Sequence, residues 1–110
     1  AKRLLNISKK NHFTMFEYWI TDHLGHGRYK EETELHLKIL DDFLYSILKN
    51  LPAHMTLLIC SDHGNLENVS IKSHTRNPTL TISAGVNAHY LSNHIKSLVD
   101  IKEAVIGSIR

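Results

Sequence analysis

Apolar and polar positions alternate in blocks along the chain, and the first three blocks predict a strand, a helix and a strand. The aromatic and apolar run FTMFEYWI at residues 13–20 indicates a buried strand. Residues 30–50 repeat leucine and isoleucine at helical spacing and are followed by Pro52, so they predict one long amphipathic helix. The run HMTLLIC at residues 54–60 predicts a second strand.

The order of the elements predicts the fold class. Residues 79–84 alternate in polarity and indicate a third strand, and residues 100–110 predict a last helix with Asp100 and Glu103 in a capping arrangement. A strand, a long helix and another strand in succession favour a right-handed parallel crossover. We therefore expect an α/β fold with a mainly parallel sheet.

An aspartate directly follows each of the first two predicted strands. Asp22 comes after residues 13–20, and Asp62 comes after residues 54–60. The functional crevice of a parallel sheet lies beyond the carboxyl ends of its strands. We therefore expect the two carboxylates to meet at one edge of the sheet.

Composition excludes several classes of protein and draws attention to histidine. The 110 residues are the size of one domain, and a net charge of +2 gives no reason to expect binding to nucleic acid or to a membrane. The single cysteine excludes an intrachain disulfide, and no apolar run approaches a membrane span, so we expect a cytoplasmic protein. Nine histidines make metal or proton chemistry worth testing.

Histidines accompany both aspartates at spacings that suit metal ligands. Asp22 and His26 are four residues apart and can both turn inward from one loop or one helical turn. Asp62 and His63 are adjacent at a bend after a strand, and His74 adds an imidazole from the following polar loop. Five oxygen and nitrogen ligands suit Zn²⁺ or Mn²⁺ better than Ca²⁺. They also suit two ions that share a site, the arrangement that clamps a phosphoryl group.

Each of these residues also has an ordinary structural interpretation. Asp22 and Asp62 are common residue types in turns and at helix N-termini. His26 and His74 could be surface imidazoles. His23 is an alternative ligand, but it neighbours Asp22 and is expected to face the other way. The metal interpretation therefore depends on all the ligands occurring together.

Three motifs resemble those of a known family. TDHLGHG, SDHGNLE and SHTRNP are similar to the metal-binding motifs of the alkaline phosphatase superfamily, and most of all to its branch with cofactor-independent phosphoglycerate mutase and phosphopentomutase. The resemblance runs from about residue 13 to the end of the chain. It implies a three-layer α/β/α fold with two divalent metal ions that bridge a phosphate.

The resemblance also implies a ligand set and a function. By motif match, Asp22, His26 and His74 would hold one ion, and Asp62 and His63 would hold the other. The implied function is metal-dependent phosphoryl transfer, by a phosphomutase or a phosphatase, on a small phosphorylated substrate. The alternative is a noncatalytic metal-binding or interaction domain that kept the ligands without the chemistry.

The chain departs from the family pattern in one respect. Members of the family carry, near their N-terminus, a further aspartate ligand and a serine or threonine nucleophile, and no segment here resembles that part. Residues 1–110 are therefore expected to be a C-terminal metal-binding portion that works with the missing N-terminal part of its own chain. Alone, this portion is expected to be inactive.

Overall fold

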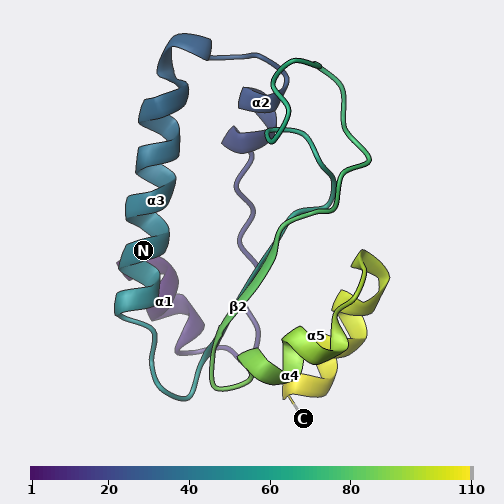
Figure 1. The fold of residues 1–110 in the computed structure, drawn as a ribbon. Coiled ribbons are helices and arrows are strands. Elements are labelled where there is room, and N and C mark those ends of the chain that lie inside the picture. The colour runs from purple at the N-terminus through teal and green to yellow at the C-terminus, as the bar shows by residue number, and fades with distance from the viewer. Residues whose placement is uncertain (110) are drawn as a thin grey trace.

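The computed structural model describes residues 1–109 and combines helices with a small sheet (Figure 1). In chain order the elements are α1 (Lys2–Ser8), α2 (Ile20–Gly25), the 3₁₀ helix η1 (Lys30–Glu32), α3 (Thr33–Lys49), β1 (Thr56–Cys60), β2 (Thr81–Gly85), α4 (Ala88–His94), the 3₁₀ helix η2 (Leu98–Asp100) and α5 (Ile101–Ile109). The mixed α/β content agrees with the prediction. No helix in residues 1–109 is both long and apolar enough to cross a lipid bilayer.

The sheet has two strands, β1 and β2, and they run antiparallel. Thr56 lies opposite Gly85 at one end, and Cys60 lies opposite Thr81 at the other. Both strands were predicted, the second about two residues too early, but the predicted mainly parallel sheet is wrong for the part of the chain described. Antiparallel neighbours need no crossover helix, and β1 and β2 are joined by one long loop over residues 61–80.

The strand predicted for residues 13–20 is wrong, and with it the parallel crossover. Residues 13–19 form neither a helix nor a strand and pair with no strand among residues 1–109, and α2 begins at Ile20. A strand needs a neighbour to pair its backbone N–H and C=O groups, and the sheet of residues 1–109 contains only β1 and β2. Its apolar side chains are correspondingly exposed, with Met15 at 72% and Trp19 at 63%.

The two predicted helices are present. The helix predicted for residues 30–50 comprises η1 and α3, whose buried position is Ile47. The last helix forms as α5, except that Arg110 lies outside the described residues. Its approach is capped one turn earlier than expected: the capping box joins Ser97 and Asp100 at η2, rather than Asp100 and Glu103.

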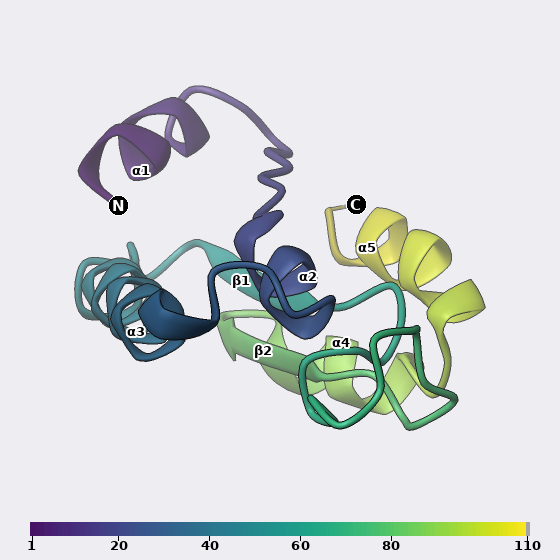
Figure 2. The same ribbon diagram turned by 90° about the horizontal axis from the view of Figure 1, so that it is seen from above.

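The helices lie on either side of the two-stranded sheet. The long helix α3 lies on one side, where α1 and α2 contact it, and α4 and α5 lie on the other, where α4 packs on β2 (Figures 1 and 2). The core is small: its buried apolar residues are Leu5, Leu24, Ile47, Leu91 and Ala104. The loop between the strands extends from the sheet towards α2 (Figure 1), and this approach builds the candidate site.

Candidate metal centre

Backbone hydrogen bonds join the two arms of the loop over residues 61–80 near the sheet. The Ser61 N–H donates to the Leu80 carbonyl at 3.0 Å, which continues the strand ladder by one bond. Further out, Gly64 and Thr75 form an isolated antiparallel bridge, in which the Thr75 N–H donates to the Gly64 carbonyl at 2.8 Å. The two arms of the loop are therefore held side by side.

This bridge brings two of the predicted ligands into contact. His63 and His74 each precede a bridge residue, so their side chains leave neighbouring points of the two arms. Their imidazole rings stack with centroids 3.6 Å apart. A ligand from each arm therefore stands at the same place, at the end of the loop that faces α2.

Helix α2 is fastened to the loop through Asn65. The Asn65 side-chain amide donates to the Asp22 carboxylate Oδ1 at 2.8 Å and to the Asp22 backbone carbonyl at 3.2 Å. Asn65 is only 5% exposed, and its amide lies where a Cβ on Gly25 would stand. The absence of a side chain at Gly25 therefore permits the close approach of α2 to the loop.

Three imidazole nitrogens surround one carboxylate oxygen. Asp22 Oδ1 lies 3.3 Å from His26 Nε2, 3.7 Å from His74 Nε2 and 3.8 Å from His63 Nε2. The ligand atoms of Asp22, His26 and His74 all lie within 4.8 Å of one another, so these three residues could hold a metal ion. The carboxylates of Asp22 and Asp62, which were expected to meet, lie 3.8 and 3.6 Å from the same His63 Nε2, although no strand precedes Asp22.

The hydrogen bond of His26 favours a cation at this point. Its Nδ1 lies 2.7 Å from the Lys72 backbone carbonyl, and because a carbonyl only accepts, Nδ1 carries a proton. In the neutral ring, the Nε2 lone pair then faces the lone pairs of Asp22 Oδ1. That arrangement is repulsive unless a cation or a proton lies between them. A carbonyl on the far ring nitrogen is also the usual support of a metal-binding histidine, so these residues fit a divalent ion.

The second predicted ligand pair lies at the edge of this cluster. Asp62 Oδ1 is 3.6 Å from His63 Nε2, and the Asp62 side chain is 87% exposed. His63 thus stands between two carboxylates, those of Asp62 and Asp22. Its Nδ1 is buried and makes no hydrogen bond to any residue of the described chain. The assignment of Asp62 and His63 to a second ion stays a prediction.

His23, the alternative ligand, takes no part in the cluster. Its ring lies 6.3 Å from the Tyr29 ring, measured between centroids. His23 is not among the residues of the described chain whose ligand atoms gather near Asp22.

One carboxylate that sequence reasoning missed, Glu67, contacts residues next to the proposed ligands. Glu67 accepts hydrogen bonds from the Asn65 N–H at 2.6 Å, from the Thr75 hydroxyl and from the Asn77 amide at 3.0 Å. The Thr75 hydroxyl, with help from Asn77 and the Asn65 N–H, lowers the pKa of Glu67 to about 2. Glu67 is therefore held as a carboxylate at neutral pH.

The sequence contained little sign of these supporting residues. Asn65 and Thr75 lie inside the recognised motifs but were given no role, and Glu67 was one acid in a polar loop. Thr75 is eight residues from Glu67, so their contact depends on how the loop folds. The Lys72 contact uses a backbone carbonyl, which every residue carries.

Comparison with known proteins identifies the family. A search of curated proteins and a search of solved structures each found no significant match. The family model described as the Metalloenzyme superfamily matches residues 1–110, the whole chain. With its aspartate and histidines gathered around one point, the chain belongs to the Metalloenzyme superfamily.

Proposed function

We propose that Asp22, His26 and His74 bind a divalent ion, Zn²⁺ or Mn²⁺, and that the chain is the ligand-bearing part of a phosphoryl-transfer enzyme. The reaction is that of a phosphomutase or phosphatase acting on a small phosphorylated substrate. The observation that carries the proposal is the meeting of His26 and His74 at Asp22 Oδ1, at 3.3 and 3.7 Å. Membership of the Metalloenzyme superfamily supports the same chemistry.

The residues of the chain have distinct parts in this proposal. His26 is turned by the Lys72 carbonyl so that its Nε2 lone pair faces the ion site. Asn65 holds the Asp22 carboxylate by its amide and leaves the other lone pairs of Oδ1 free. A divalent ion bound there supplies Lewis acidity for displacement at phosphorus. Asp62 and His63 supply the ligands that this chain offers to a second ion.

The nucleophile belongs to another segment in this proposal. The family resemblance assigns it to a serine or threonine in an N-terminal segment that no part of residues 1–110 resembles. We therefore expect the 110 residues to bind metal without transferring phosphate, and turnover to require the segment that carries the nucleophile. A purely metal-binding domain is the outcome if that segment does not restore turnover.

Metal binding by the 110-residue chain tests the proposal directly. Isothermal titration with Zn²⁺ and with Mn²⁺ is expected to show binding that Asp22→Ala and His74→Ala each weaken by more than about 100-fold, beyond the loss typical of supporting residues. His54→Ala is the matched control, because His54 is exposed and precedes β1, at the opposite end of that strand from Asp62 and His63. Equal affinity in all four proteins would show that the ligand assignment is wrong.

A further inference from the structure

We propose that Glu67 is a positioning residue of this site: it clamps the two arms of the loop over residues 61–80 and so fixes His74 against His63 and Asp22. The inference rests on the proposed metal site and deepens it. Glu67 makes no polar contact with the proposed ligands in the structure of residues 1–109, so any effect on the metal is transmitted through its hydrogen-bond partners.

One carboxylate group spans both arms. Its Oε2 accepts the Asn65 N–H at 2.6 Å, on the outgoing arm that leaves β1. Its Oε1 accepts from the Thr75 hydroxyl and from the Asn77 amide at 3.0 Å, both on the returning arm that leads to β2. Because each oxygen serves a different arm, loss of one oxygen releases one arm and leaves the other held.

The returning arm connects Glu67 to His74. Thr75 directly follows His74, and its hydroxyl both donates to Glu67 and accepts the Asn77 N–H at 3.2 Å. A Cβ on Gly64 would meet both the Thr75 hydroxyl and the Glu67 carboxylate, so a side chain there would displace the clamp. The backbone that carries the His74 ring is therefore fixed on both sides of Thr75.

The outgoing arm connects Glu67 to Asp22. Asn65 gives its backbone N–H to Glu67 and its side-chain amide to Asp22 Oδ1. The same carboxylate thus controls the placement of two proposed ligands from opposite sides. Supporting residues of this kind typically alter metal affinity by about 10- to 100-fold.

A double-mutant cycle separates positioning from general stability. We expect Glu67→Ala to weaken Zn²⁺ binding by about 10- to 100-fold, as measured by isothermal titration. Glu67→Gln keeps an acceptor for Thr75 and Asn77 and should lose less. In a His74→Ala background, Glu67→Ala should cost less than it does in the wild-type chain, because one of the two ligands that it positions is already gone. Glu103→Ala, at an exposed glutamate of α5, is the control.

A metal-free measurement keeps the proposal testable on its own. The nuclear Overhauser contact between the His63 and His74 rings should vanish in Glu67→Ala and weaken in Thr75→Val, the gentler variant if the first does not fold. If the wild-type chain binds no Zn²⁺, the proposed function fails, and this ring contact still decides the clamp. Persistence of the contact in both variants, or an equal loss of affinity in the two backgrounds of the cycle, would overturn it.

Discussion

The imidazole rings of His63 and His74 lie in a stack, with planes inclined by only 16° and centroids 3.6 Å apart. The two residues belong to opposite arms of one loop, and the bridge between Gly64 and Thr75 holds those arms together. The stack therefore marks the point at which the two arms of a long polar loop bring their side chains together. The Asp22 carboxylate, delivered by α2, lies against the same point.

The two aspartates of the site should differ in their effect on metal binding. Asp22 Oδ1 is surrounded by three histidines, whereas the Asp62 side chain is 87% exposed and lies close only to His63. We expect Asp22→Ala to abolish measurable Zn²⁺ binding and Asp62→Ala to weaken it by about tenfold, an effect typical of a peripheral group. Elemental analysis after dialysis measures both variants. A greater loss with Asp62→Ala would mean that the ion sits between Asp62 and His63.

Gly25→Ala should separate α2 from the loop. A Cβ at this position would overlap the buried Asn65 amide, which then has to give up its bonds to Asp22. We expect a loss of about 1–3 kcal/mol in the free energy of unfolding, as is usual for an overpacked contact. Urea denaturation measures it, with the exposed Ser73→Ala as control. Unchanged stability would show that Asn65 moves aside without cost.

Acid should open the loop between about pH 4.5 and pH 2. The Thr75 hydroxyl lowers the pKa of Glu67 to about 2 from its ordinary value of 4.5. Because the native pKa is the lower one, the contribution of Glu67 is complete above pH 4.5 and is lost as the pH falls through its native pKa. The carbon-13 shift of the Glu67 carboxyl group measures the titration, and Glu67→Gln identifies the signal. A midpoint near 4.5 would contradict the clamp.

Ser97→Ala should loosen the start of α5. The Ser97 hydroxyl lies 2.9 Å from Asp100 Oδ2, within the capping box that precedes the helix. Loss of such a cap typically costs about 1 kcal/mol, and the cost should appear as faster amide exchange in α5 and a lower urea midpoint. Ser73→Ala again serves as the control, with an expected effect below about 0.5 kcal/mol. Equal effects of the two variants would show that the Ser97 cap does not stabilise α5.

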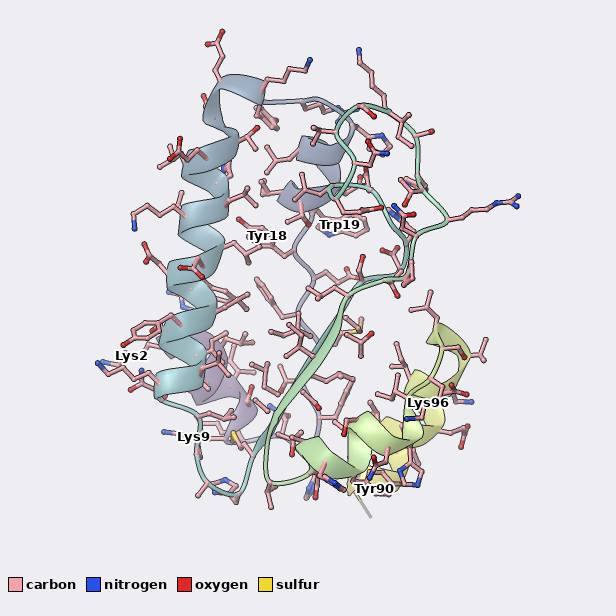
Figure 3. The ribbon with its side chains drawn as sticks, in the orientation of Figure 1. Lys2, Lys9, Tyr18, Trp19, Tyr90 and Lys96 are labelled. Carbon is pink, nitrogen blue, oxygen red and sulfur yellow. The ribbon has the colours of Figure 1, made fainter. Side chains whose placement is uncertain are left out.

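The segment over residues 13–19 should be accessible to solvent and should promote association between copies of the chain. Figure 3 shows Tyr18 and Trp19 where this segment enters α2, with Tyr18 on the side of α3. Trp19 is 63% exposed and Met15 is 72% exposed. We expect iodide to quench the fluorescence of Trp19, the single tryptophan of the chain, nearly as well as that of a free indole. Met15→Ser should reduce concentration-dependent association, because exposed apolar patches promote it. A shielded Trp19 would show that the segment is covered in solution.

Sequence patterns predicted the helices that depend on contacts between residues close together in the chain. The helix over α3 follows from leucine and isoleucine at helical spacing, because that spacing alone puts them on one face. The short helix α2 was missed because its apolar start looked like the end of a strand. The capping box was misplaced by one turn, since Ser97 and Asp100 satisfy the same pattern as Asp100 and Glu103.

The pattern of apolar residues could not predict whether the strands pair in parallel or antiparallel. An apolar run such as residues 56–60 reads the same in a parallel and an antiparallel sheet, and the neighbour decides between them. Residues 13–19 have the composition of a strand but pair with no other strand of the described chain. Composition can therefore indicate a strand while the tertiary structure decides whether it forms.

The sequence by itself determined the residue types and spacings on which the proposed metal site rests: Asp22 and His26 four residues apart, and His74 in a polar loop after β1. Residue type and short spacing were enough for this, because ligand chemistry and one helical turn are local properties. Only the tertiary structure decided that His63 and His74 stack, and that Glu67 and Asn65 lie behind them. Those contacts join residues from separate arms and elements, and their geometry is set by how the loop closes on α2.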